Sequence, residues 1–129
     1  MRVRTALVGY GYWGPNLLRN LLENPHCDVV AVCDSGEQQL ARAAARHPHL
    51  RLMRSLDEVV ASDAEAVYVA TPISTHFPIA RTLLRAGKHV FVEKPLTAST
   101  ADAEALIEEA DRADRRLMVG HTFEYNPAI

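Results

Sequence analysis

The sequence predicts an α/β fold, a doubly wound parallel sheet of about six strands with helices on both faces. Two observations lead to this fold class. Short apolar runs rich in β-branched residues alternate with stretches of helical spacing along all 129 residues, as in repeated strand–helix units. The runs "VVAVC" and "VYVA" have no alternating polar positions, which is typical of parallel strands buried on both faces.

Six segments are expected to form the strands. In chain order they are residues 2–8, 29–33, 50–53, 66–70, 90–92 and 117–119. Six strands match the doubly wound nucleotide-binding fold, in which the strand order is 3-2-1-4-5-6 and ligands gather at the carboxyl ends of the strands. Residues that directly follow a strand are therefore the first candidates for function.

The segments between the strands carry helix signals. Apolar residues recur at helical spacing in two of them, namely Leu17, Leu18, Leu21 and Leu22 in the first and Ile79, Ala80, Leu83 and Leu84 in the second. Residues 38–46 are rich in alanine and arginine, which favour a helix. Gly87 follows the second stripe and predicts the end of that helix.

Two further helices are expected from the residues that begin them. Ser55 and Glu58 have the spacing of a capping box. Ser99 or Thr100 is expected to cap the last helix, and Glu109 on that helix is expected to be solvated.

Length and composition are those of one ordinary globular domain. The chain is 48% hydrophobic and 23% charged with a net charge of −2, so its charge does not favour binding to nucleic acid or to an anionic membrane. Its apolar runs are too short to span a bilayer, and the N-terminus reaches glycines before a signal-peptide core develops. Cys27 and Cys33 are too few for a disulfide framework, and Cys33 is expected to be a buried, reduced thiol. We expect a cytoplasmic protein with neither nucleic-acid nor membrane partners.

The first strand runs directly into "GYGYWG", a complete G-x-G-x-x-G motif. Gly9 permits the tight turn, Gly11 lets a pyrophosphate approach the backbone, and Gly14 lets the next helix pack close to the strand. The helix that follows offers free amides and a positive dipole end to the phosphates. Tyr12 and Trp13 lie inside the motif, and we include them among the expected cofactor-binding residues. Because the motif stands between a strand and an amphipathic helix, a cofactor site is favoured over an ordinary turn.

Asp34 ends the second strand twenty positions after Gly14, where an acidic residue binds the ribose hydroxyls of the adenosine. A carboxylate repels a 2′-phosphate, so NAD is favoured over NADP. Ser35 could still help a phosphate, and the nearest arginine in sequence, Arg42, is expected on the helix behind.

Thr71 and Pro72 follow the fourth strand, and His76 comes shortly after them. Two interpretations remain open. Thr71 and Pro72 are a strand stop with His76 as a surface cap, or all three lie along the nicotinamide half of the cofactor at the same sheet edge.

Glu93, Lys94 and Pro95 follow the fifth strand. A lysine after a strand is usually solvated, which is one interpretation. The other places Glu93 and Lys94 beside the nicotinamide, where a partly buried Lys94 exchanges a proton with substrate. Pro95 restricts the backbone at this point, and the bond before it is a candidate for the cis form.

His121 closes the sixth strand at the same edge, where it either contacts cofactor or substrate or is a structural residue. His26, His47, His49 and His89 stand in loops or at strand starts, away from this edge. No group of His, Cys, Asp and Glu has the spacing of metal ligands, so no metal is expected.

With "GYGYWG", "CD", "ATP" followed by "TH", "GKHVFVEKPL" and "VGHTFEYNPA" in this order, the chain resembles the Gfo/Idh/MocA oxidoreductases. The resemblance implies a Rossmann domain that binds NAD, a catalytic Lys94, and a Lys94–Pro95 bond that is often cis. It also implies that His121, Tyr125 and Asn126 lie near the nicotinamide or the substrate. "GYWGPNLLRN" and "GHTFEYNP" look most like members that act on nucleotide-linked or amino sugars, such as UDP-N-acetylhexosamine 3-dehydrogenases and 3-ketosugar reductases.

The resemblance covers only the N-terminal half of that family. We expect residues 1–129 to form the dinucleotide-binding domain, and the family's C-terminal α/β substrate domain, which usually carries the homo-oligomer interface, to be absent from the chain. The expected function is hydride transfer between NAD(H) and a sugar or nucleotide sugar, with little activity in this chain alone. A free-standing, non-catalytic dinucleotide-binding sensor module and a non-catalytic structural remnant are the alternatives.

Overall fold

A computed structural model describes residues 1–120, in which strands and helices alternate. The strands are β1 (Val3–Val8), β2 (Cys27–Cys33), β3 (Arg51–Met53), β4 (Ala66–Val69), β5 (His89–Glu93) and β6 (Leu117–Gly120). The helices are α1 (Gly14–Glu23), α2 (Glu37–Arg46), α3 (Leu56–Ala61), α4 (Ile73–Arg85) and α5 (Thr100–Ala113). Each predicted strand is present, with ends within two residues of the expected ones.

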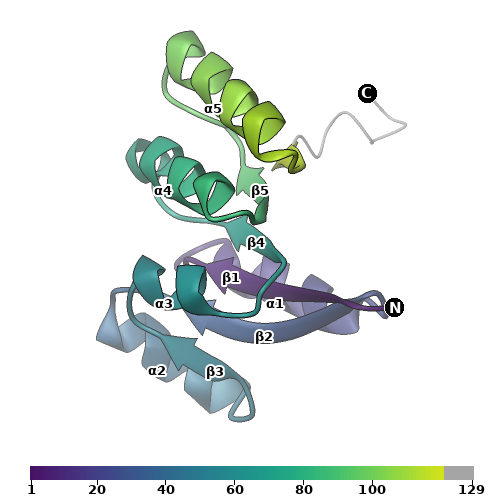
Figure 1. Cartoon of the computed structure of the whole chain (residues 1–129). Helices are drawn as coiled ribbons and strands as arrows, with labels where there is room; N and C mark the ends of the chain where they lie inside the picture. The colour runs from purple at the N-terminus through teal and green to yellow at the C-terminus, as the bar shows by residue number, and fades with distance from the viewer. Residues whose placement is uncertain (121–129) are drawn as a thin grey trace, which may run out of the picture.

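The strands form one parallel sheet in the order β3-β2-β1-β4-β5-β6, as predicted (Figure 1). The chain leaves β1 toward β2 on one side and later returns to place β4 on the other side. The strand order therefore reverses at β1, and the loops after β1 and β4 diverge there. This switch point is where ligands of such folds bind.

Successive residues of a strand point to opposite faces of the sheet, and helices pack on both faces, so side chains on both faces are buried. Leu7 and Val32 belong to a cluster with Leu18 of α1 and Ala43 of α2. The other face holds the larger cluster, which includes the following residues of β1, β2, β4, β5 and the helices α3 to α5: Ala6, Val8, Ala31, Val67, Val92, Val59, Leu83 and Leu106. The pattern explains why the central strands read as continuous apolar runs.

One apolar row keeps exposed surface. Tyr68, Phe91 and Met118 are paired across β4, β5 and β6, and the rings of Tyr68 and Phe91 stack with centroids 4.6 Å apart. The row lies on the face that α1 and α2 cover over β1 and β2, and Met118 is half exposed.

The helix ends confirm some capping predictions and contradict one. Ser99 caps α5, since its hydroxyl accepts the backbone N–H of Asp102 at 3.2 Å. Gly87 follows the last residues of α4 with φ of 83°. The predicted capping box of α3 is wrong, because the side chain of Ser55 makes no capping bond to the described residues. The Glu58 carboxylate instead accepts the backbone N–H of Arg54 at 3.3 Å.

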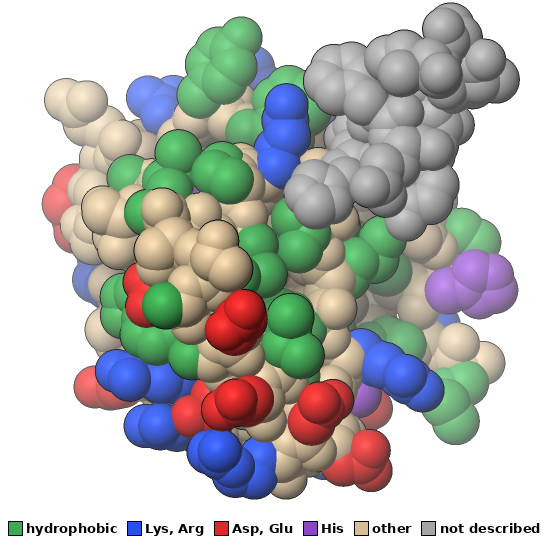
Figure 2. Space-filling view, turned by 90° about the horizontal axis from the view of Figure 1, so that it is seen from above, with side chains coloured by type: hydrophobic (Ala, Val, Ile, Leu, Met, Phe, Trp, Pro, Cys, Tyr) green, Lys and Arg blue, Asp and Glu red, His purple; other side chains and the backbone are tan. Residues whose placement is uncertain are grey.

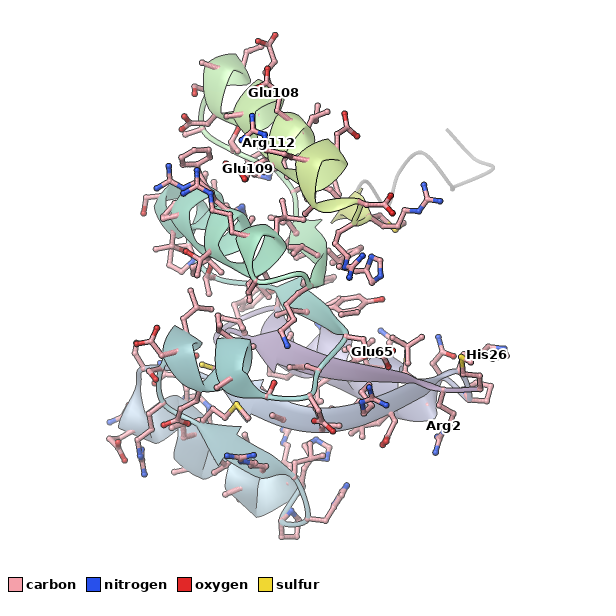
Figure 3. The ribbon with its side chains drawn as sticks, viewed as in Figure 1. Arg2, His26, Glu65, Glu108, Glu109 and Arg112 are labelled. Atoms are coloured by element: carbon pink, nitrogen blue, oxygen red, sulfur yellow. The ribbon has the colours of Figure 1, made fainter. Side chains whose placement is uncertain are left out.

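The predicted solvation of Glu109 is also wrong. Its carboxylate lies on the side of α5 toward α4 and accepts two hydrogen bonds from Arg85, from Nε at 3.0 Å and Nη2 at 2.6 Å (Figure 3). Arg112 lies 3.7 Å away on the same helix. Hydrogen bonding to Arg85 lowers the pKa of Glu109, and the same bond raises the pKa of the Arg85 guanidinium. The pair therefore links α4 to α5 through a nearly buried carboxylate.

Charge is mixed on the face seen in Figure 2, where acidic and basic side chains lie near one another mainly in the lower part of the view and apolar side chains mainly above them. This arrangement agrees with the small net charge of −2. The longest described helix, α5, has 14 residues, so no described helix is long enough to cross a membrane.

Candidate functional site

A cavity of about 500 Å³ opens at the carboxyl ends of β1 to β4. Its volume falls in the range of small-molecule sites, roughly 300–1,000 Å³. The cavity is lined by Val8, Gly9, Gly11, Cys33, Asp34, Ser35, Gln39, Arg54, Leu56, Ala70, Thr71, Pro72, Thr75 and Ile79. It therefore joins the glycine turn, the end of β2 and the end of β4, three of the places selected from the sequence.

The three glycines of the turn have different roles in the structure. Gly9 has φ of 104°, and a Cβ there would lie 2.4 Å from the carbonyl oxygen of Ala70. A Cβ on Gly14 would lie 2.2 Å from the carbonyl oxygen of Gly9, so this glycine allows α1 to begin close to β1. A Cβ on Gly11 would meet no described atom within 4 Å. The fold itself requires Gly9 and Gly14, whereas Gly11 leaves open space beside the backbone, which fits a phosphate group.

The start of α1 has no negative charge of its own. Trp13 is the N-cap residue and makes no side-chain capping bond to the described residues, and the first turn contains no acidic side chain. Pro15, in that first turn, removes a donor that the helix would not use internally. The positive end of the helix dipole therefore remains available to an anion.

The carboxylate of Asp34 is held in place by two backbone N–H groups, one from the glycine turn and one from the N-cap residue of α2. Oδ2 accepts the N–H of Tyr10 at 2.7 Å, and Oδ1 accepts the N–H of Gly36 at 2.8 Å. Each oxygen keeps a lone pair for a further donor. A carboxylate fixed in this way fits the two hydroxyls of a ribose, and together with Gly11 it makes the residues present fit the adenosine–pyrophosphate part of a dinucleotide.

Thr71 and Pro72 line the cavity as expected for cofactor contact, but His76 does not. Its ring is 1% exposed, so a role as a surface cap is wrong. Nε2 lies 2.8 Å from the carbonyl oxygen of Thr71, and Nδ1 lies 2.8 Å from that of Pro95. Both partners only accept hydrogen bonds, and a neutral imidazole has a single N–H, so the ring donates to one carbonyl in each tautomer and contacts the other. In either tautomer the ring lies between the two loops and fixes their spacing. The geometry favours a positioning role for His76 over direct cofactor contact.

Glu93 and Lys94 lie at the end of β5, on the predicted edge but outside the cavity lining. The Lys94–Pro95 peptide bond is cis. The structure leaves Lys94 exposed. The expected partial burial of this side chain is therefore wrong in the part of the chain that the structure describes. Glu93 is half-buried over Gly120, where a Cβ would lie 2.8 Å from Glu93 Oε1. The catalytic role of Lys94 and the cofactor contact of Glu93 remain predictions.

Other expected site residues are not brought into the cavity. Tyr12 is 95% exposed and Trp13 is 44% exposed, and neither lines it. His121, Tyr125 and Asn126 lie outside the described residues 1–120, and their roles remain predictions.

Arg54 is the main residue of the cavity that was not predicted. It follows β3, lines the cavity, and donates from Nη1 to the carboxylate of Glu37. The rule that selected Asp34, a position directly after a parallel strand, also applies to Arg54. Arg42, the arginine considered from the sequence, lies on α2 and does not line this cavity. Thr75 and Ile79 were also missed, and they reach the cavity from the first two turns of α4.

Cys33 lines the cavity, so the reactivity of its thiol as a nucleophile bears on what the site can do. It is buried, as predicted, and burial together with the carboxylates of Asp34 and Glu58 raises the pKa of its thiol to about 11. A thiol that stays protonated at neutral pH is a poor nucleophile. Among the described residues there is also no group of His, Cys, Asp and Glu that could hold a metal ion.

Comparison with known proteins identifies relatives of this domain. The family model "Oxidoreductase family, NAD-binding Rossmann fold" (GFO_IDH_MocA) matches residues 3–121. A 4-carboxy-2-hydroxymuconate-6-semialdehyde dehydrogenase of Sphingobium sp. is 35% identical over 127 residues, which are 98% of this chain and 40% of that protein. The UDP-N-acetylglucosamine 3-dehydrogenase of Acidithiobacillus ferrooxidans is 33% identical over 129 residues, which are 100% of this chain and 40% of that protein.

Solved structures have the same fold. GenD2 from gentamicin A biosynthesis, in complex with NAD, superposes with a TM-score of 0.92 at 38% identity, covering 98% of this chain and 36% of GenD2. The WlbA dehydrogenase of Chromobacterium violaceum, in complex with NADH and UDP-GlcNAcA, superposes with a TM-score of 0.91 at 30% identity, covering 97% and 36%. The chain thus spans about 40% of the length of the curated relatives it matches.

Proposed function

Because the chain belongs to the Gfo/Idh/MocA oxidoreductase family, whose domain is an NAD-binding Rossmann fold, we propose that residues 1–129 bind NAD(H) for a dehydrogenase acting on a sugar or nucleotide sugar. The cavity at the switch point carries this proposal. It combines an open approach to the backbone at Gly11, an uncompensated start of α1 and a fixed carboxylate at Asp34. These three features suit the pyrophosphate and the adenosine ribose of one ligand.

Different residues of this chain would bind different parts of the cofactor. The backbone N–H groups of the glycine turn, from Gly11 to Gly14, would bind the pyrophosphate, and Asp34 would accept hydrogen bonds from the ribose hydroxyls. Farther along α1, Pro15 has no N–H, and the N–H groups of Asn16 and Leu17 donate to the Trp13 carbonyl. Thr71 and Pro72 would contact the cofactor where it passes the end of β4. When bound, the cofactor supplies the nicotinamide ring that accepts or donates the hydride.

Lys94 is proposed as the residue that exchanges a proton with the sugar hydroxyl or ketone. Two observations support this role. Lys94 follows the carboxyl end of β5, which pairs with β4, and the residues after β4 line the cavity. Lys94 is also the lysine of the "EKP" sequence. His76 holds the carbonyl of Pro95 and thereby the turn that carries Lys94. His121, Tyr125 and Asn126 are proposed to contact substrate.

A nucleotide sugar is the substrate class we favour. Support comes from a 33% identical UDP-N-acetylglucosamine 3-dehydrogenase and from the WlbA structure with UDP-GlcNAcA. Domain organisation is also proposed: residues 1–129 act as the cofactor domain and need a second, substrate-binding domain that forms the homo-oligomer. A cytoplasmic location is supported by the two free thiols, Cys27 and Cys33.

Calorimetric titration with NAD and NADH tests the proposal. We expect saturable binding by the wild-type chain and a clear loss in a Gly11→Ala variant of equal melting temperature. Absence of binding at millimolar cofactor, with the two proteins indistinguishable, would contradict it. If NAD binds but the complete protein turns over no nucleotide sugar, the domain is a binding module and the proposed reaction is wrong.

A further inference from the structure

An ion pair between Arg54 and Glu37 stands at the adenosine end of the cavity. Arg54 follows β3 and lines the cavity together with Asp34 and Ser35, whereas Glu37 begins α2. Glu37 directly follows Gly36, whose N–H binds the Asp34 carboxylate at 2.8 Å. The pair therefore lies next to the carboxylate that is proposed to bind the adenosine ribose.

The charges at this end are predominantly negative. Asp34, Glu37 and Glu58 contribute three carboxylates, and Glu58 reaches the backbone N–H of Arg54 at 3.3 Å. Arg54 contributes one positive charge, and Glu37 engages it directly. Asp34 and Glu58 both raise the pKa of the Cys33 thiol, so their negative field extends into the cavity. A 2′-phosphate, with a charge of about −1.5 to −2 at pH 7, would meet net repulsion here.

Arg54 could nevertheless bind such a phosphate if Glu37 did not hold it. The contact with Glu37 uses Nη1, one part of a guanidinium with five N–H donors that matches phosphate oxygens in pairs. Both side chains are largely exposed, 62% for Arg54 and 76% for Glu37, and an exposed ion pair of this kind contributes little to folding stability, so removing Glu37 frees Arg54 without unfolding the domain.

We propose that Glu37 sets the cofactor preference of this domain by engaging Arg54 and, with Asp34, excluding the 2′-phosphate of NADP. Glu37 is a specificity-determining residue that need not touch the cofactor, and its removal converts Arg54 into a phosphate-binding residue. The inference rests on the proposed binding of NAD(H) and extends it to the choice between the two nicotinamide cofactors.

Titration calorimetry with NAD and NADP, and with 5′-AMP and adenosine 2′,5′-bisphosphate as fragments, tests the inference. Glu37→Gln is expected to raise the affinity for NADP relative to NAD, and for adenosine 2′,5′-bisphosphate relative to 5′-AMP, by about five- to tenfold. The reason is that one nearby negative charge is removed and Arg54 is released. Adding Arg54→Met is expected to abolish that gain. The gain should also shrink as ionic strength rises.

Glu108→Gln is the matched control, because it removes the same charge from the exposed side of α5. The inference is overturned if Glu37→Gln leaves the affinity ratio unchanged, if Glu108→Gln gives the same gain, or if the gain survives Arg54→Met. It is also overturned if the wild-type chain binds NADP as tightly as NAD. A wild-type chain that binds neither cofactor overturns the proposed function and this inference together, whereas normal NAD binding with an unchanged ratio overturns this inference alone.

Discussion

Nδ1 of His76 lies 2.8 Å from the carbonyl oxygen of Pro95, so a buried side chain of α4 holds the turn that follows Lys94. The same ring contacts the carbonyl of Thr71 through Nε2. The loop that lines the cavity and the loop that carries Lys94 are therefore joined through one imidazole.

Replacing His76 by Ala is expected to lower the free energy of unfolding by about 1–3 kcal/mol, because a buried ring is removed and the carbonyl to which it donates loses its hydrogen bond. Urea unfolding followed by circular dichroism measures this loss. His26→Ala, at an exposed position, is the control and should change stability little. Equal stability of the two variants would contradict the role assigned to the buried ring.

Alanine at Gly14 is expected to lower stability, whereas alanine at Gly11 is expected to lower NAD affinity. Gly14→Ala should destabilise the fold by about 1–3 kcal/mol, because its Cβ would lie 2.2 Å from the Gly9 carbonyl oxygen. Gly11→Ala should change stability by less than about 0.5 kcal/mol. It should weaken NAD binding about tenfold or more, because the added Cβ fills the open space through which a phosphate reaches the backbone and so costs about one hydrogen bond to a charged group. Melting temperatures and calorimetric titrations separate the two effects, and a Gly11→Ala variant with full NAD affinity would count against a pyrophosphate at this position.

Lys94→Met in the complete enzyme is expected to reduce turnover by about two decades or more, since acid–base catalysis contributes about that much. NAD affinity should change little, because Lys94 lies outside the cavity lining. Steady-state kinetics with a nucleotide sugar, combined with NAD titration, provides both values. Unchanged turnover would leave Lys94 a binding or structural residue.

The Glu109–Arg85 pair predicts a pH dependence of stability. The folded pKa of Glu109 lies below the ordinary value of 4.5, so the stabilisation is complete above about pH 4.5 and is lost as the pH falls through the lowered pKa. Glu109→Gln should therefore be less stable than the wild type at pH 7, and the difference should shrink in acid. Urea unfolding across pH 3 to 7, with Glu108→Gln as the control, measures it. A difference that does not change with pH would exclude the carboxylate charge as its cause.

Cys27 and Cys33 are expected to react at different rates with a thiol reagent. Cys33 is 4% exposed and its pKa is raised to about 11, whereas Cys27 is partly exposed. Mass spectrometry after brief alkylation at neutral pH should find label on Cys27 first, and both cysteines should react in denaturant. Rapid labelling of Cys33 in the folded protein would contradict its burial.

Much of this structure follows from local sequence patterns. The apolar runs identify each strand, and the rule that ligands bind at the carboxyl ends of parallel strands selects Gly9, Asp34 and Thr71 from the sequence alone. Those positions depend on the order of strands and helices along the backbone, which the periodicity of apolar residues predicts well.

Side-chain partners depend on packing between distant segments, and the sequence pattern does not report them. Glu109 looks solvated on its own helix, yet its partner Arg85 is 24 residues away on α4. His76 stands near the correct edge, but only the packed structure shows that it does not line the cavity and that its ring contacts the carbonyls of Thr71 and Pro95. Arg54 follows the short strand β3, and its pairing with Glu37 required the proximity of β3 and α2.

The two hydrogen bonds to Asp34 have a practical consequence for redesign. Exchanging the acidic residue after the second strand for a neutral one is the direct way to admit NADP. In this protein that exchange would also remove the acceptor for the N–H groups of Tyr10 and Gly36, and so would loosen the glycine turn and the start of α2. An engineer who wants a cofactor switch without a loss of thermal tolerance should leave Asp34 in place and edit the periphery of the cavity.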